Sequence, residues 1–162
     1  MIVDDIPIFL EYLRGFINWE EYGFEICAQA SNGKEAFDMM QAMNTGHEGS
    51  ITTLHSNSPE DAINRLETMM LMNDMELPVN AIRNYIEKAI DIVIQIDRLS
   101  DGKRKITSIS EVVGMKNDKL CLNEIFAFKE KGLSDQGNVR GEFVVYKYIP
   151  KVYDRMKRKG IL

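Results

Sequence analysis

The apolar residues of this chain switch repeatedly between helical and alternating spacing, and this pattern sets the fold class. Val79, Ile82, Ile86 and Ala89 recur at helical spacing, which predicts an amphipathic helix. A β-branched run follows directly, so residues 92–96 are predicted to form a strand. Because helical and strand patterns alternate along the chain, we predict an α/β fold.

The same alternation predicts most of the remaining elements. Ser58 is a favourable N-cap and the proline after it suits a first helical turn. Asp101-Gly102 is a turn signal. We expect a βαβα start, with a strand at 1–3, a helix from Pro7, a strand at 24–29 and a helix at 36–43. Beyond it we expect strands at 51–55, 92–96, 106–113, 120–128 and 143–149, helices at 59–70, 79–90 and from Lys151, and a polar loop at 132–141.

Length and charge restrict the function classes. The 162 residues fit one domain, or one domain with a fragment, and the net charge of −5 argues against a nucleic-acid binder. Residues 1–40 hold eight acids and two bases, whereas the rest is nearly balanced. Cys27 and Cys121 sit in apolar surroundings and lack metal or redox spacing, so we expect buried, reduced thiols in a cytoplasmic protein. No signal peptide or membrane span is indicated.

Both histidines lie in one polar stretch, GHEGSITTLHSNSP at residues 46–59. A metal pair of His47 and His55 is disfavoured, because no cysteine or carboxylate cluster completes it. Nucleophilic catalysis by Ser56 or Ser58 lacks a base and an orienting group. Two readings therefore remain, a ligand-contacting loop and a plain polar turn before a capped helix.

The first 35 residues resemble the start of a response-regulator receiver domain. WEEYGFEI and SNGKEA follow an acidic pair in the usual order and spacing. By this resemblance Asp4 and Asp5 match the carboxylates that help to hold Mg²⁺, a role that suits carboxylate oxygens. The third strand with its phosphorylatable aspartate does not follow, so only a weak metal site is expected.

Residues 33–162 resemble the C-terminal part of the type II/IV secretion-system ATPases, closest to the CpaF-like motors of tight-adherence pilus assembly. The resemblance is carried by TGHEGSITTLHSNSP, LNEIFAFK and GEFVVYKYIP. It implies part of a RecA-like P-loop fold and identifies the polar stretch as the histidine box, with His47, Thr52, Thr53 and His55 sensing nucleotide. It also implies ATP and Mg²⁺ as cofactors, a hexamer of ATPase subunits, and a cytoplasmic motor at an inner-membrane secretion platform.

The printed sequence departs from that family at its catalytic motifs. No GxxxxGK[ST] loop occurs, and alignment on Gly33 places Ala30 where the Walker B glutamate is expected and Asn32 where an arginine is expected. Such motors need the loop and the acid to hold phosphate and metal. We therefore expect neither ATP hydrolysis nor tight nucleotide binding by this chain alone. The missing front half of the family protein also argues against a hexamer.

Two alternatives stay open at this point. Residues 1–35 could serve a response-regulator-like signalling module, or the whole chain could be a non-catalytic structural α/β chimera. The C-terminal helix raises a separate question. Its bases could face anionic lipid or a partner, with a solvated face as the simpler reading; they are Lys151, Arg155, Lys157, Arg158 and Lys159.

Overall fold

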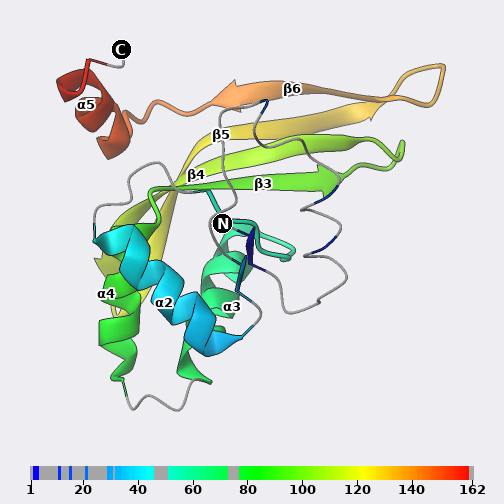
Figure 1. The fold of residues 1–162 in the computed structure, drawn as a ribbon. Coiled ribbons are helices and arrows are strands. Elements are labelled where there is room, and N and C mark those ends of the chain that lie inside the picture. The colour runs from blue at the N-terminus through cyan, green and yellow to red at the C-terminus, as the bar shows by residue number, and fades with distance from the viewer. Residues whose placement is uncertain are drawn as a thin grey trace. The chain divides into compact units, whose positions relative to one another are not determined.

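The computed structural model of the protein divides the chain into two compact units, Met1–Ala89 and Ile90–Leu162. Within them it describes residues 2–3, 11, 15, 21, 29–30, 32–45, 51–72 and 77–160. Among these residues, Figure 1 lets the reader follow the helices α2, α3 and α4 in the first unit and, in the second, a sheet followed by the helix α5. The division falls after residue 89, whereas the expected boundary at residues 33–35 separates two sequence resemblances and stays a prediction.

The first unit begins with a short parallel strand pair. β1 (Ile2–Val3) lies beside β2 (Gln29–Ala30), with Ile2 opposite Gln29 and Val3 opposite Ala30. The predicted strand at 1–3 is confirmed. Of the strand expected at 24–29, only Gln29 lies among the described residues, and β2 extends from it to Ala30. The helix expected from Pro7 falls mostly on residues outside those that the structure describes.

Three helices form the core of the first unit, and all three were predicted. They are α2 (Gly33–Asn44), α3 (Pro59–Leu71) and α4 (Val79–Ala89), and each packs against the other two. The Phe37 ring meets Tyr85 edge-on at 5.2 Å between centroids. The buried apolar residues are Ala36, Phe37, Met39, Met40, Ile63, Leu66, Met70, Ile82 and Ile86. Burial of this shared face is what stabilises helices of this length.

Side-chain contacts fix where α2 begins and how α4 meets α3. Asn32 caps α2, because its side-chain oxygen accepts the Glu35 N–H at 3.0 Å. Arg83 of α4 donates to both carboxylate oxygens of Glu67 of α3, at 2.9 and 2.6 Å. Both side chains of that pair are largely covered, so its fork geometry contributes to the orientation of the two helices.

The second unit is built on a four-stranded antiparallel sheet in sequential order. The strands are β3 (Ile92–Arg98), β4 (Arg104–Lys116), β5 (Lys119–Leu133) and β6 (Val139–Val145). Between β4 and β5 the turn has positive φ at both Asn117 (51°) and Asp118 (58°). These angles match the mirror-image turn that suits the twist of a hairpin, and Asn and Asp tolerate them well.

Three sequence expectations are wrong. The polar loop expected at 132–141 shrinks to residues 134–138, because β5 continues to Leu133 through an irregularity at Gly132 and β6 starts at Val139. The strand expected at 143–149 is therefore found earlier in the chain, as β6 at Val139–Val145. Residues 51–55 form no strand, since none of the strands described pairs with them and an unpaired strand leaves its backbone polar groups unsatisfied.

The chain ends in α5 (Lys151–Arg158), as the basic terminal pattern predicted. Together the helices and strands agree with a mixed α/β chain, although the larger sheet is entirely antiparallel. Among the described helices, none combines the length and the apolar character needed to cross a bilayer.

Candidate functional site

The candidate site is residues 51–58, an irregular segment that leads into the N-terminus of α3. We call this segment the phosphate-loop candidate. Ser58 begins that helix by accepting the Asp61 N–H on its hydroxyl oxygen at 3.1 Å. Ser56 donates its hydroxyl to the Ser58 carbonyl, also at 3.1 Å. Because both serine hydroxyls stabilise the helix entry, neither is arranged as a nucleophile.

The two threonines of the loop face the first unit's interior in different ways. Thr52 donates a weak hydrogen bond to the Met39 sulfur at 3.8 Å. The hydroxyl of Thr53 is buried and finds no hydrogen-bond partner in the described part of the chain. A buried hydroxyl without a partner costs free energy. A polar atom that formed a hydrogen bond to the Thr53 hydroxyl would therefore stabilise this loop.

His55 follows on the exposed side of the same loop. The structure therefore brings Thr52, Thr53 and His55 together on one short irregular segment. His47, Asp4 and Asp5, which sequence reasoning also singled out, lie outside the described residues, and their roles stay predictions.

The start of α3 is not itself an anion site. Its first turn carries Glu60 and Asp61, whose negative charge complements the positive helix end. The Asp61 and Ala62 N–H groups are already bonded to the Ser58 hydroxyl and carbonyl. A phosphate approaching this loop would therefore be met by hydroxyl and imidazole side chains rather than by helix N–H groups.

Metal binding has no visible support in this part of the protein. No group of three or more His, Cys, Asp or Glu side chains converges among the described residues. Cys121 is a free, half-buried thiol rather than the buried one expected from its apolar surroundings. Cys27 lies outside the described residues.

Sequence reasoning missed a buried carboxylate in the second unit. Glu111 of β4 is only 2% exposed, and it accepts the Val152 N–H at 2.8 Å and the Tyr148 hydroxyl. Burial alone would raise the pKa of Glu111, but these bonds and nearby Lys151 outweigh it and hold the pKa below its usual value. The signal in the sequence is a lone acid inside the apolar run ISEVVG.

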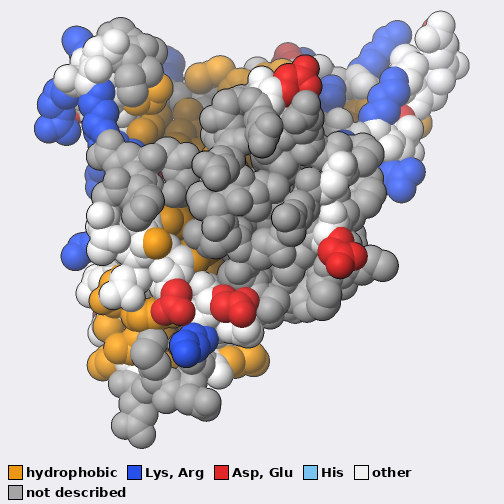
Figure 2. All heavy atoms as spheres, viewed as in Figure 1, with side chains coloured by type: hydrophobic (Ala, Val, Ile, Leu, Met, Phe, Trp, Pro, Cys, Tyr) orange, Lys and Arg blue, Asp and Glu red, His pale blue; other side chains and the backbone are white. Residues whose placement is uncertain are grey.

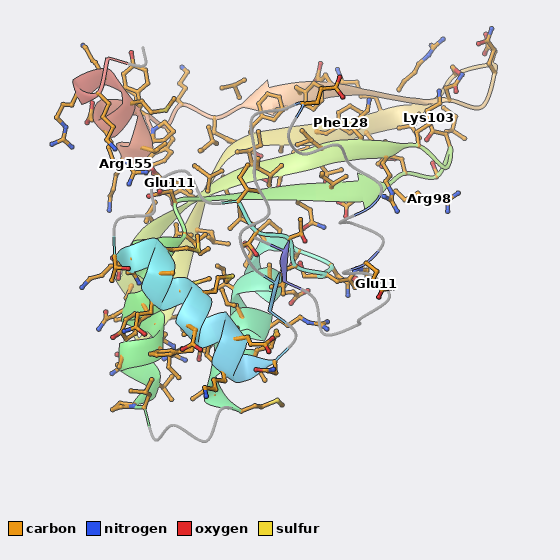
Figure 3. The ribbon with its side chains drawn as sticks, in the orientation of Figure 1. Glu11, Arg98, Lys103, Glu111, Phe128 and Arg155 are labelled. Carbon is orange, nitrogen blue, oxygen red and sulfur yellow. The ribbon has the colours of Figure 1, made fainter. Side chains whose placement is uncertain are left out.

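Two further contacts attach α5 around this carboxylate. The Lys151 ammonium donates to the Val113 carbonyl at 2.7 Å, and Arg155 forms an ion pair with Asp91. Figure 3 shows Glu111 and Arg155 beside each other where α5 meets the sheet. We call Glu111 with these partners the helix anchor. It fixes one face of α5 and leaves the other to solvent.

At the opposite end of the sheet, Asp101 joins two hairpins. Its carboxylate accepts the Lys103 N–H at 3.0 Å and the Val139 N–H at 2.9 Å. The backbone hydrogen bonds from Val139 and Lys103 hold the pKa of Asp101 below its usual value. Lys103 also reaches the Asn138 side chain at 2.7 Å. These contacts are structural, because they satisfy turn backbone rather than face a cavity.

Comparison with known families and proteins bears on the loop and on the sheet together. The family model described as "Type II/IV secretion system protein" matches residues 32–153. The type IV secretion system protein PtlH of Bordetella pertussis is 37% identical over 81 residues, 48% of this chain and 24% of that protein. The type IV secretion system protein VirB11 of Brucella suis is 35% identical over 94 residues, 56% of this chain and 26% of that protein.

The conjugal transfer protein TrbB of Rhizobium radiobacter gives a similar result. It is 31% identical over 83 residues, which cover 51% of this chain and 24% of TrbB. The matched part of the chain thus spans about a quarter of the length of the curated relatives.

Proposed function

Because this chain belongs to the type II/IV secretion system protein family, we propose that it is the C-terminal nucleotide-sensing and subunit-contact region of a secretion or pilus-assembly ATPase. The observation that carries the proposal is the phosphate-loop candidate, which lies inside the family match. This loop presents an exposed imidazole at His55 and, at Thr53, a buried hydroxyl that has no hydrogen-bond partner among the described residues. Both groups can donate hydrogen bonds to phosphate oxygens, the imidazole directly and the Thr53 hydroxyl once the loop has moved to uncover it.

In this proposal the loop reports on a phosphate that other residues hold. Thr53 and His55 donate to the terminal phosphate oxygens, Thr52 and His47 are assigned to the same nucleotide-sensing role, and the loop passes the change to α3 through Ser58 and its cap. When phosphate leaves, the Thr53 hydroxyl loses its partner. This raises the free energy of the phosphate-bound conformation of the loop and favours a different one. ATP and Mg²⁺ are the proposed ligands, and neighbouring ATPase subunits the proposed partners, in a cytoplasmic assembly at an inner-membrane secretion machine.

Hydrolysis by this chain alone is not part of the proposal. The printed sequence carries no GxxxxGK[ST] loop, and Asn32 is used as the cap of α2. Alignment on Gly33 would put Ala30 at the position of the family glutamate. Without these groups little stabilises charge on a transferring phosphoryl group. We also propose that the chain is most similar to the CpaF-like pilus motors and that it is part of a RecA-like fold. Both proposals rest on the sequence resemblance, above all on the histidine box.

Phosphate release tests this part of the account. The purified chain is incubated with Mg²⁺-ATP and released phosphate is measured, with His55→Ala as the matched variant. We expect no turnover above the buffer blank for either protein. Appreciable turnover that survives repurification and falls in His55→Ala would show that a complete nucleotide site had been overlooked.

One observation supports a second function. The parallel pairing of β1 with β2, followed by α2, is the arrangement that a receiver-like start requires. A phospho-switch would use Asp4 and Asp5 and needs an acceptor carboxylate close to them. Labelling with acetyl phosphate that disappears in Asp4→Ala would favour this function, and an unlabelled protein would exclude it. The structural-chimera reading predicts a folded protein that neither binds nucleotide nor takes up phosphate.

A further inference from the structure

The strand β6 forms one edge of the four-stranded sheet, and among the described strands it pairs only with β5. Figure 1 shows it along the outer side of that sheet. Residues 140–143 and 145 of this strand are exposed, with Phe143 at 49% and Val145 at 68%. Figure 2 shows apolar side chains on this border of the second unit toward α5, and Lys and Arg side chains toward the tip of the β5–β6 hairpin. An exposed apolar edge is a template for pairing with another strand.

The backbone of β6 directs a row of hydrogen-bonding groups away from the sheet. The Tyr146 N–H donates to the Ile125 carbonyl of β5 at 3.0 Å. Because backbone groups alternate in direction along a strand, those of residues 142 and 144 also face β5, whereas those of residues 141, 143 and 145 face outward. A second strand placed beside β6 would meet these three residues.

This edge is held in its extended form by contacts inside the unit. The Phe143 ring stacks on Phe126 with 4.6 Å between centroids and meets Phe128 at 5.2 Å. On the other face of β6, Glu142 forms an ion pair with Lys131 of β5, and both side chains are more than half exposed. Because β6 is already ordered, pairing with another strand costs little conformational entropy.

Two charged side chains favour a second copy of β6 as the partner. Arg140 and Glu142 lie on one face of the strand, with Gly141 between them. In antiparallel pairing about a two-fold axis through Gly141, each Arg140 faces Glu142 of the other copy. An axis one residue away in either direction would place two Arg140 or two Glu142 side chains opposite each other, and like charges there are destabilising.

The other edge of the sheet, β3, offers no such match. Its charged residues Asp97 and Arg98 are neighbours in the strand, so their backbone groups turn to opposite sides. Two-fold pairing matches outward groups with outward groups, and it cannot place these two residues opposite each other. Complementary charge therefore distinguishes β6 from β3.

We propose that β6 pairs antiparallel with β6 of a second copy of this chain, so that two four-stranded sheets join into one continuous sheet. The two Gly141 residues exchange a pair of backbone hydrogen bonds, and each Phe143 N–H donates to the Val139 carbonyl of the other copy. The Val139 N–H takes no part, because it is bonded to Asp101. This contact closes after two copies and so differs from the head-to-tail contacts that build a ring of subunits.

The inference goes beyond the proposed function, and it is tested on the full chain without nucleotide. Sedimentation equilibrium over a range of protein concentrations should show monomers and dimers. A seven-residue edge is a small contact, so we expect a Kd on the order of 100 µM. In NMR exchange experiments the Gly141 and Phe143 amides should become protected as the dimer forms, while the amides of residues 142 and 144 are protected at every concentration.

Charge reversal tests the register. Arg140→Glu and Glu142→Arg, each alone, put like charges opposite each other at two places and should raise Kd at least about tenfold. The variant that carries both substitutions restores opposite charges and should return Kd to within about threefold of wild type. Lys116→Glu, an exposed position in β4 outside the contact, matches the charge change of Arg140→Glu and should alter Kd less than about twofold.

Circular dichroism of each variant checks that it is folded, and amide exchange in the wild type tests the contact without any substitution. Four results would overturn the inference. They are a chain that stays monomeric at millimolar concentration, a dimer in which the Gly141 and Phe143 amides gain no protection, a loss in Lys116→Glu equal to that in Arg140→Glu, or a folded double variant that does not regain association. None of them would bear on the role proposed for the phosphate-loop candidate.

Discussion

Replacement of Glu111 by glutamine should weaken the second unit more than its single lost charge implies. Glu111 is nearly inaccessible, and its two oxygens accept hydrogen bonds from two different groups, the Tyr148 hydroxyl and the Val152 N–H. Glutamine keeps the volume of the side chain but supplies only one oxygen. Its NH₂ group must then face one of the two donors. If it faces the Val152 N–H, that donor loses its acceptor; if it faces Tyr148, the phenol oxygen accepts instead and the phenol proton loses its acceptor on residue 111.

The size of the effect follows from these two bonds. A hydrogen bond to a charged group contributes about 1.5 to 3 kcal/mol, and a buried donor left unpaired costs about 1 to 3 kcal/mol. One bond weakened and one donor orphaned give an expected loss of about 3 kcal/mol in the free energy of unfolding. Glu111→Gln should therefore release α5 from the sheet, and amide exchange in α5 should accelerate.

The pH dependence of the free energy of unfolding gives a second, independent test of the role of Glu111. Hydrogen bonds from Tyr148 and Val152 outweigh burial and hold the pKa of Glu111 below that of an unfolded glutamate. Its stabilising contribution is therefore complete above the unfolded pKa, near 4.3, and is lost as the pH falls through the lower folded pKa. The stability difference between wild type and Glu111→Gln should shrink across that acid range.

Urea unfolding monitored by circular dichroism, at neutral and acid pH, measures both effects. Tyr148→Phe provides the matched variant, since it removes only one donor and should cost about 1 to 2 kcal/mol. The double variant should lose less stability than the sum of the two single losses, because both substitutions act on one contact. A loss below about 0.5 kcal/mol for Glu111→Gln at neutral pH, or a difference that does not change with pH, would refute the reasoning.

Three further substitutions test the packing and the loop. Gly141→Ala should destabilise the sheet by about 1 to 3 kcal/mol in a thermal melt, because a Cβ there would lie 2.3 Å from the Phe128 ring; an unchanged melting temperature would contradict the close approach. Ile86→Ala should cost about 2 to 5 kcal/mol, against less than about 1 kcal/mol for Ile94→Ala, since Ile86 is 0% exposed and Ile94 is 53% exposed; equal losses would count against the three-helix core. Ser58→Ala should cost about 1 kcal/mol by removing the cap of α3, and denaturant unfolding that shows no loss would remove the link between the loop and that helix.

Sequence patterns predicted the helices well because their signals are local. The spacing of Val79, Ile82 and Ile86 defines one face of α4, and Ser58 with Pro59 marks the start of α3 to the residue. Strands were harder to bound, since a strand depends on a partner that can be far away in the sequence. Residues 51–55 have a strand-like composition without a partner strand among the described residues, so the prediction failed there.

The functional residues divide in the same way. Thr52, Thr53 and His55 were identifiable because they lie within one specific stretch of sequence. Glu111 was not, because its partners are 37 and 41 residues away and only the fold brings α5 to β4. A lone acid in an apolar strand can signal such a buried contact, but the pattern does not say which groups it binds.

The central claim is that the phosphate-loop candidate contacts nucleotide phosphate, and the chain offers a direct probe because it contains only two histidines. Imidazole proton resonances can be followed by NMR while Mg²⁺-ATP or Mg²⁺ with adenosine is added, with His55→Gln used to assign the signals. Because this chain lacks the loop that would hold the phosphate, the account predicts small, unsaturated shifts of the His55 resonances with millimolar Mg²⁺-ATP and none with adenosine. Resonances that remain unmoved by Mg²⁺-ATP, or that move equally with adenosine, would contradict it.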